Sequence, residues 1–173
     1  RREVMHDRPG YERAVDMLKA RLSRKPYVSE MLLTGYDVVP PAPPLKDLKE
    51  ATIALVSTGG LVPKGNQDRL VGSRAENFYR YDLEGVSSLS VEEWESVHGG
   101  FGTLILNTKN PNYAMPLSTV RFLEDTGAIG GVYPWFFSTT GNGAAVSAGR
   151  RMGAEIAAEL NEHDVDGVLL VAT

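Results

Sequence analysis

The sequence contains no cysteine among its 173 residues. Disulfide bonds and thiol chemistry are therefore excluded within this segment. No stretch approaches the roughly 20 consecutive apolar residues that span a bilayer, and no secretory signal pattern is visible. The net charge of -4 gives no general attraction to nucleic acids or anionic lipids. We expect a soluble, cytoplasmic protein.

The residues that are present fit a globular α/β protein. Apolar residues make up 42% of the sequence and charged residues 23%, which is typical of a domain with a packed core. The length suits one domain better than two. The sequence begins with Arg1 rather than Met and stops at Thr173 inside a predicted strand. We interpret it as one lobe of a longer chain.

The first 44 residues predict a segment that is separate from the core. Apolar residues recur at helical spacing from about Pro9 to Leu22, so a helix is predicted there. The proline-rich stretch 40–44 forbids regular structure and favours a linker or a surface strap. We assign residues 1–44 to a helix with a strap, and residues 45–173 to the α/β domain.

The stretch Ala51–Asn66 organises the predicted domain. An apolar run ends here in Ser-Thr-Gly-Gly, which predicts a buried strand whose carboxyl end is a usual place for ligands in an open α/β sheet. Hydroxyl groups, glycines that allow close backbone approach and one positive charge follow the strand. These candidate binding residues are Ser57, Thr58, Gly59, Gly60 and Lys64. The alternative is a glycine turn after a core strand.

Short patterns predict the elements that follow. Ser90 with two acidic residues behind it predicts a short helix to Val97, and the run Thr103–Asn107 predicts a second strand. A helix is predicted from Pro116 to about Asp125, ended near a glycine. The charged stretch Asp68–Asp82 predicts a loop, whose arginines could meet an anion or be solvated; they are Arg69, Arg74 and Arg80.

The last third of the chain predicts strand, helix and strand. The run Val132–Phe137 reads as a strand, although Pro134 requires an edge position, a bulge or a non-strand segment. The helix that follows has an apolar stripe and two glycines expected to allow close approach to the sheet; these residues are Val146, Met152, Ile156, Leu160, Gly149 and Gly153. Asp166–Thr173 predicts a buried strand. The fold class is α/β, a three-layer Rossmann-like open sheet with mostly parallel strands.

Two glycine-rich turns are candidate sites. His98 precedes a double glycine, a position where an imidazole could serve as acid, base or anion donor. The second turn lies between an apolar run and a helix, where free N–H groups and the helix dipole favour an anion. Its residues are Thr139, Thr140, Gly141, Asn142 and Gly143. The alternatives are a structural histidine at position 98 and a well-capped helix after the second turn. His6 beside Asp7 could form an acid/base pair, although a surface histidine near a helix start is favoured.

Six strings, in order and over nearly the whole chain, resemble the selenoprotein B component of the glycine, sarcosine and betaine reductases of anaerobic bacteria that ferment amino acids. They are VMHDRPGYERAVDML, ALVSTGGLVPKGNQDR, SVHGGF, NPN with the following Pro116, TTGNGAAV and VDGVLLVAT. The selenoprotein subunit of D-proline reductase is more distantly similar.

The resemblance implies an oxidoreductase that works only within a complete chain and a multi-subunit complex. In that family a selenolate or thiolate cleaves a C–N bond reductively, and the selenocysteine or cysteine directly follows the strand that is VLLVAT here. The implied partners are a pyruvoyl-type substrate-activating subunit, a small selenoprotein acceptor and a small amine or amino acid. We expect an oligomer, with no cofactor or metal bound by this segment.

A chalcogen nucleophile works best when its charged form is stabilised by helix N-termini, an imidazolium or a lysine. We therefore expect His98 to act as proton donor or charge partner, and Lys64 to stabilise the nucleophile. The stretches 57–60 and 140–143 are expected to cradle the substrate carboxylate or its Schiff base. The alternatives are a non-catalytic binding or scaffold domain and, less favoured, a racemase-like enzyme.

Overall fold

The computed structural model describes residues 8–29, 38–100 and 102–173. The predicted pair of His6 and Asp7 lies outside this range. The chain divides into two compact units, residues 1–42 and residues 43–173. None of the helices in the described ranges is long and apolar enough to cross a bilayer.

The first unit contains one helix, α1 (Gly10–Leu22), which confirms the helix predicted near the start of the chain. Pro9 occupies its N-cap, and its preset φ suits the entry into a helix. The apolar side chains of Val15, Leu18 and Leu22 are exposed along it. Its charged side is tied by hydrogen bonds from Arg8 to acidic side chains within the helix.

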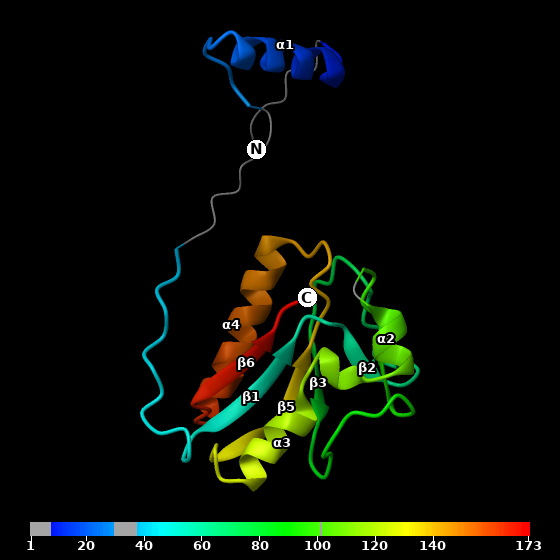
Figure 1. The fold of residues 1–173 in the computed structure, drawn as a ribbon, viewed down its shortest axis with the longest axis vertical. Coiled ribbons are helices and arrows are strands. Elements are labelled where there is room, and N and C mark those ends of the chain that lie inside the picture. Colours follow the sequence, from blue (N-terminus) through cyan, green and yellow to red (C-terminus); the bar gives the residue numbers. More distant parts are fainter. Residues whose placement is uncertain (1–7, 30–37, 101) are drawn as a thin grey trace. The chain divides into compact units, whose positions relative to one another are not determined.

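The second unit is built on an open sheet of four strands in the order β3-β5-β1-β6 (Figure 1). Strand β1 pairs in parallel with β5 and β6, whereas β3 is antiparallel to β5. A separate antiparallel pair joins β2 and β4. The mostly parallel open sheet confirms the predicted fold class. The elements are β1 (Thr52–Ser57), β2 (Leu61–Pro63), β3 (Tyr79–Asp82), β4 (Trp94–Ser96), α2 (Thr103–Thr108), η1 (Pro111–Tyr113), α3 (Leu117–Asp125), β5 (Gly131–Ser138), α4 (Val146–Glu162) and β6 (Gly167–Val171).

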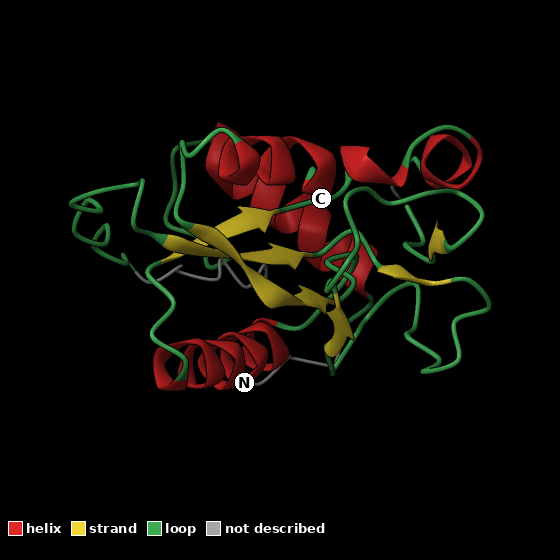
Figure 2. Ribbon diagram, turned by 90° about the horizontal axis from the view of Figure 1, so that it is seen from below, coloured by secondary structure: helices red, strands yellow, loops and turns green. Residues whose placement is uncertain are grey.

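Figure 2 shows the strands of the sheet as a layer with helices beside it. Side chains alternate along the strands and divide the core between the two faces of the sheet. On one face Leu55 and Phe136 pack in a cluster with Leu117 and Val120 of α3. The other face carries Ala54, Val56 and Phe137, which pack with Ile156 and Leu160 of α4. Burying a side chain of this size stabilises the fold by roughly 1.5–3 kcal/mol.

Two of the predicted elements are wrong. The run Thr103–Asn107 forms helix α2 rather than a strand, because only Leu106 among its apolar side chains is buried and one buried residue per turn suits a helix. The side chain of Asn107 fixes this helix against β4, bonding the N–H and the C=O of Ser96 at 2.6 and 3.0 Å.

The predicted helix from Ser90 to Val97 is a turn followed by β4. Ser90 does cap a turn, because its hydroxyl accepts a hydrogen bond from the Glu93 N–H at 3.3 Å. Trp94 and Ser96 are then buried with Glu95 less so between them, which is the alternation of a strand. The predicted loop 68–82 is confirmed except at its end, where β3 forms.

Pro134 lies in β5 at an irregularity, as one of the three predicted alternatives required. The register between β1 and β5 shifts between Ile53, opposite Val132, and Leu55, opposite Phe136. Between these pairs one residue of β1 lies opposite three of β5, so the proline occupies a bulge, where a missing N–H is tolerated. The helix α3 is confirmed, and Gly127 follows it with a φ of 68°.

Helix α4 is confirmed, but two statements about its faces are wrong. Val146 is half exposed, and Ala148 takes its place in the buried stripe with Met152, Ile156 and Leu160. The glycines Gly149 and Gly153 do not bring α4 onto the sheet, since a Cβ at either position would meet no atom within 4 Å. They face open space instead.

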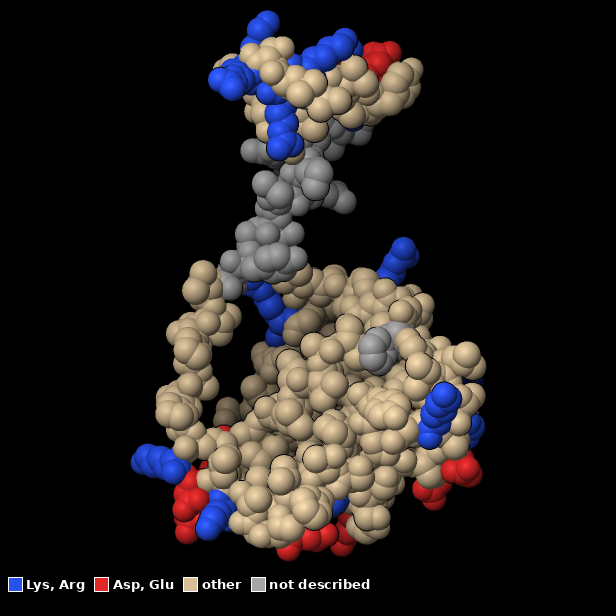
Figure 3. Space-filling model, viewed as in Figure 1, with Lys and Arg blue, Asp and Glu red and all other residues tan. Residues whose placement is uncertain are grey.

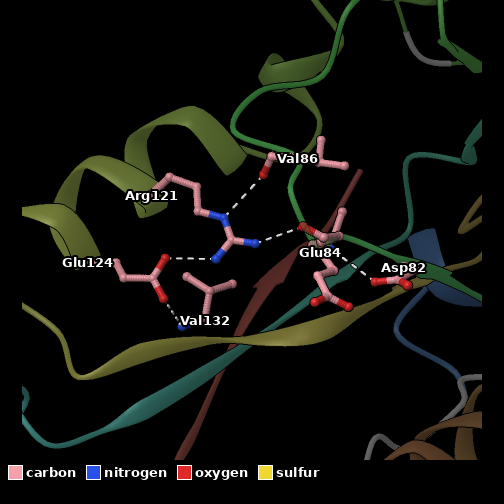
Figure 4. Close-up of polar contacts among 7 residues, drawn as sticks. Asp82, Glu84, Val86, Arg121, Glu124 and Val132 are labelled. Carbon is pink, nitrogen blue, oxygen red and sulfur yellow. Dashed lines mark hydrogen bonds and ion pairs between the residues drawn. The ribbon is translucent and has the colours of Figure 1, made fainter.

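Arg121 of α3 ties the helix to the loop after β3 and to β5 (Figure 4). Its guanidinium donates hydrogen bonds to the carbonyls of Val86 and Leu83 at 3.2 and 2.9 Å, and to Glu124 at 2.7 Å. Glu124 in turn accepts from the N–H of Val132 at 2.9 Å. The two side chains thus connect α3 to the loop after β3 and to the start of β5.

Candidate functional site

The carboxyl ends of β1, β5 and β6 meet at one edge of the sheet. Ser57, the last residue of β1, lies opposite Ser138 of β5 and Val171 of β6. The segments that leave these strands therefore enter one crevice, which is the arrangement expected for a ligand site in an open parallel sheet. Most of the predicted site residues lie in these segments.

The turns that follow β1 and β5 are joined by a short antiparallel bridge between Gly59 and Thr140. The N–H of Gly60 donates to the carbonyl of Thr139, and the N–H of Gly141 donates to the carbonyl of Thr58, both at 2.9 Å. These amides were expected to be available for an anion. They serve instead to hold the two turns together.

Glycine is required at position 60 by both conformation and space. Its φ is +62°, and a Cβ there would lie 2.9 Å from the Thr140 Cγ2 and 3.0 Å from the His98 N. The two predicted turns thus approach one another through Gly60. The sequence predicted that the glycine would let the backbone approach a ligand. In the structure it lets the backbone approach Thr140 and His98 of the same chain.

Thr173 lies in the crevice beside both turns. Its N–H donates to the Thr58 hydroxyl at 2.9 Å, and the two threonine hydroxyls lie 3.0 Å apart. A Cβ on Gly141 would be 3.2 Å from the Thr173 carbonyl oxygen, and one on Gly59 would be 3.5 Å from its methyl group. The structure therefore brings the end of the last strand together with Thr58, Gly59 and Gly141, as expected for the ends of parallel strands in one sheet.

Three of the four predicted hydroxyls bond to the protein framework. Ser57 is fully buried, and its hydroxyl donates to the Ala114 carbonyl at 2.8 Å while accepting from the Gly59 N–H. The hydroxyls of Thr139 and Thr140 donate to carbonyls of the loop 71–77. Thr58 differs, because its hydroxyl contacts Thr173.

His98 follows β4 and is buried behind Gly60. Its backbone N–H donates to the hydroxyl of Ser96 at 3.2 Å, and Ser96 donates to the carbonyl of Gly59 at 2.7 Å. The ring Nδ1 accepts from the Gly100 N–H at 3.2 Å, so a neutral imidazole carries its proton on Nε2. Burial lowers the pKa of His98 below its usual value of about 6.5, which favours this neutral form.

Ser96 is a residue that the sequence did not identify. It links the His98 turn to the turn after β1, since its hydroxyl contacts the backbone of both. The residue lies in a three-residue strand that the sequence presented as the end of a helix. Nothing in its immediate neighbours indicated the role.

Asn142 and Gly143 face the other side of the crevice. The Asn142 carbonyl accepts from the Arg74 N–H at 2.7 Å, and its side-chain amide nitrogen would lie 3.2 Å from a Cβ on Gly99. A Cβ on Gly143 would lie 3.5 Å from the Arg74 Cγ. Arg74 is thereby the arginine of the three anion candidates that the structure places beside the predicted turn.

Lys64 lies away from the crevice. Its ammonium group donates to the Val91 carbonyl at 3.1 Å, and its N–H donates to the Glu93 carbonyl. It lies three residues beyond Leu61 along β2, which is about 10 Å at the rise of a strand. These contacts do not support the expected role beside the nucleophile.

The predicted helix N-terminus is also displaced from the turn. Helix α4 begins at Val146 with Ala145 as its N-cap, so 139–143 lies before the first helical turn. The expectation that the helix dipole acts directly at Thr140–Gly143 is wrong. Among the described residues, no three His, Cys, Asp or Glu side chains gather closely enough to hold a metal ion.

An apolar groove of about 350 Å³ opens from the crevice along α4. Thr58, Thr139, Thr140 and Gly141 line its upper end, and the rest is lined by side chains of α4 and of strands β1 and β6. The predicted turns thus form one end of this apolar groove, which runs between α4 and the strands β1 and β6.

Comparisons with known proteins identify the family of this chain. The family model for glycine/sarcosine/betaine reductase selenoprotein B matches residues 1–173. The glycine reductase complex component B subunit gamma of Carboxydothermus hydrogenoformans is 38% identical over all of this chain and 40% of its own length. The sarcosine reductase complex component B subunit beta of Peptoclostridium acidaminophilum is 36% identical over all of this chain and 39% of its own.

A D-proline reductase subunit gamma of Acetoanaerobium sticklandii is more distant, with 30% identity over 78% of this chain and 55% of its own length. The match to the selenoprotein B family, with the D-proline reductase subunit more distant, confirms the resemblance predicted from the sequence. The chain spans about 40% of the length of the glycine and sarcosine reductase subunits named above. The comparison with solved structures gave no significant match.

Proposed function

The chain belongs to the glycine/sarcosine/betaine reductase selenoprotein B family, and from this membership we propose that it is part of an oxidoreductase complex that cleaves a C–N bond reductively. The substrate class is a small amino acid or amine such as glycine, sarcosine or betaine. The partners are a substrate-activating subunit of the pyruvoyl type and a small selenoprotein that accepts the product.

The observation that carries this proposal is the position of Thr173. It lies between Thr58 and Gly141 at the carboxyl ends of parallel strands. One further residue would lie about 3.8 Å beyond its Cα, still within the crevice. We place the selenolate or thiolate nucleophile there, directly after Thr173.

The chemical step is a displacement. The chalcogenate supplies the electron pair for a new bond to the substrate carbon, the C–N bond breaks, and the amine leaves with its bonding electrons and takes up a proton. A chalcogenate of the acceptor selenoprotein then attacks the same carbon, and the carbon–chalcogen bond to this chain breaks, which returns its chalcogenate. A thiolate of the acceptor next attacks the acceptor's own chalcogen, so that a chalcogen–sulfur bond forms and the carbon leaves with the electron pair and takes up a proton. The acceptor is thereby oxidised as the substrate is reduced.

Thr58 is the residue of this chain best placed to orient the nucleophile, because its hydroxyl bonds the backbone of Thr173. Of the two roles expected for His98, the contacts favour a donor over a charge partner. Its lowered pKa and the bond to Nδ1 favour a neutral ring that donates from Nε2, rather than an imidazolium that pairs with a negative charge.

A second function from another class is a binding or scaffold domain without a nucleophile. It is favoured by the use of the cradle amides in the bridge between Gly59 and Thr140. It is also favoured by the apolar lining of the groove behind the crevice.

Sequencing by mass spectrometry separates the two functions. The protein is isolated from the cells that make it, and the peptide that runs out of β6 is sequenced. Selenocysteine or cysteine directly after Thr173 supports the reductase. Any other residue there, or a chain that stops at Thr173, excludes the chalcogen mechanism and leaves the scaffold.

Replacing His98 tests its role within the reductase. In the complete chain assembled with its complex, His98→Ala should lower turnover by at least about 100-fold, because a hydrogen-bond donor at the reacting groups is lost. His163→Ala, on the exposed end of α4, is the matched control and should leave turnover unchanged. Equal turnover of both variants would remove His98 from the site.

A further inference from the structure

Strand β6 leaves apolar side chains uncovered on the face of the sheet that carries α4. Val168 and Leu170 are 51% and 58% exposed, although both point to the side where α4 covers Ala54 and Val56 of the neighbouring strand. They form one wall of the apolar groove. In the view of Figure 3 most of the visible surface of this unit is uncharged; acidic side chains lie near its lower margin, and Lys or Arg side chains lie there and at a few places higher up.

The opposite wall of the groove is a side of α4 made of small residues. Gly149, Gly153 and Ala157 recur at a spacing of four and line the groove together. A Cβ at either glycine would meet no atom within 4 Å. Helices pack with their axes 8–10 Å apart, at the shorter distance when the contact residues are small, so this side of α4 has room for a second helix.

The order of the strands predicts where a further helix lies. The chain crosses from β1 to β5 in one direction with α3 on one face, and returns from β5 to β6 in the other direction with α4 on the opposite face. Crossovers between parallel strands are right-handed. A unit that extends the sheet beyond β6 continues in the direction of the second crossover. Its helix therefore lies on the face of α4, above Val168 and Leu170.

The outer edge of β6 also lacks the features that protect a free edge. Its five residues, GVLLV, include no charge and no proline, and its pairing with β1 is regular. Exposed edges in natural proteins are usually blunted by such residues or by a bulge. The composition of β6 is that of an interior strand.

We propose that a helix–strand unit from the part of the family's longer polypeptide that this chain does not match docks on this surface. Its strand pairs in parallel with β6, and its helix packs beside α4 over Val168 and Leu170. The curated relatives supply enough chain for such a unit, since the region matched here is about 40% of their length. The proposal does not depend on the reductase chemistry.

One consequence concerns the crevice. A crossover helix runs antiparallel to its strands, so its N-terminus would lie at the carboxyl end of β6, near Thr58 and Gly141. The crevice would then gain a third wall and the positive end of a helix dipole. That dipole replaces the one wrongly expected from α4.

The test measures thiol accessibility in a short and a long chain. Because the chain has no cysteine, Leu170→Cys introduces a single thiol on the proposed surface, and Ser87→Cys introduces one at an exposed site after β3. The long chain is the Carboxydothermus hydrogenoformans subunit with residues 1–173 in place of the region that they match. Both chains react with a maleimide, and mass spectrometry measures the rate of labelling at each introduced cysteine.

In the 173-residue chain both thiols should react fast. In the long chain, labelling at Leu170→Cys should slow by at least about ten-fold, as for a site exposed only by local opening, while Ser87→Cys should be unchanged. Adding Gly153→Leu should restore fast labelling at position 170 in the long chain, because the leucine occupies the space of the docked helix, and should leave the folding of the short chain intact.

Two outcomes would overturn the proposal. One is fast labelling at Leu170→Cys in a folded long chain. The other is protection in the short chain that grows with protein concentration, which would mean that a second copy covers the surface. If the long chain does not fold, hydrogen exchange of the natural subunit decides: slow exchange in the strand that aligns with Gly167–Val171 supports the proposal, and fast exchange rejects it.

Discussion

Strands β1 and β6 are neighbours with similar sequences and opposite surroundings. In their parallel register Leu55 lies beside Leu169, and Val56 lies beside Leu170. Leu55 is fully buried, whereas Leu169 is 38% exposed, because β1 has a strand on each side and β6 has one. An apolar run therefore predicts a strand whose side chains need burial. It does not identify the elements that bury them, because these lie elsewhere in the sequence.

The largest predicted effect is the difference in lost stability between alanine substitutions of Leu55 and Leu169. Leu55→Ala should lower the free energy of unfolding of the 173-residue chain by about 2–5 kcal/mol, because it leaves a cavity in the core. Leu169→Ala should lower it by no more than about 1 kcal/mol, since water already reaches that side chain. Urea unfolding monitored by circular dichroism measures both.

Equal losses from the two substitutions would mean that β6 is covered in the isolated chain. In that case the contrast between the strands would fail. The slope of the urea transition serves as a check that both variants unfold from the same compact state.

Two glycines extend the contrast between packed and open surroundings: Gly60 lies in a tightly packed turn, and Gly153 lies on the open side of α4. Gly60→Ala should destabilise the chain by about 2–3 kcal/mol, since the alanine must adopt a φ of +62° and its Cβ would press on Thr140 and His98. Gly153→Ala should stabilise it by about 0.5–1 kcal/mol, because alanine favours a helix and the space beside α4 is open. Thermal unfolding of the two variants measures the difference.

Gly65→Ala is the control for conformation alone. Gly65 also has a positive φ, but a Cβ there would meet nothing within 4 Å. A loss at Gly60 no larger than the loss at Gly65 would show that the two turns do not press together through this residue.

The long patterns in the sequence predicted the framework well. The run 52–56 gave the central strand, and the apolar stripes gave α3 and α4, since these patterns extend over several turns or a whole buried strand. The meeting of Thr173 with Thr58 also followed, because parallel strands end at one edge.

The short patterns failed where the deciding contact was distant. The run TLILN fits a strand or a helix equally well, and Asn107 decides for a helix through its bonds to Ser96. The bridge between Gly59 and Thr140 joins residues far apart in the chain. No local signal reports such a bridge, so the amides that it uses were counted as available for a ligand.

The smallest predicted effect is the difference in stability between variants of two ion pairs. Glu124 on the packed side pairs with Arg121, with 28% and 20% of the side chains exposed, whereas Glu155 pairs with Arg151 on α4, with about half of each exposed. Near pH 7, Glu124→Gln should cost about 1 kcal/mol, because hydrogen bonds to the charged carboxylate are weakened. Glu155→Gln should change the stability by less than about 0.5 kcal/mol.

The pH dependence of stability identifies the carboxylate. Burial alone would raise the pKa of Glu124, but the hydrogen bonds from Arg121 and from the Val132 N–H, with the charge of Arg121, outweigh it and lower the pKa. The folded state then holds the proton more weakly than the unfolded state, so the stabilisation is present above the unfolded pKa of about 4.3 and disappears as the pH falls through the lowered value. The gap between the wild-type chain and Glu124→Gln in urea midpoint should therefore close in acid, and a gap that persists there would show that Glu124 acts by packing rather than by charge.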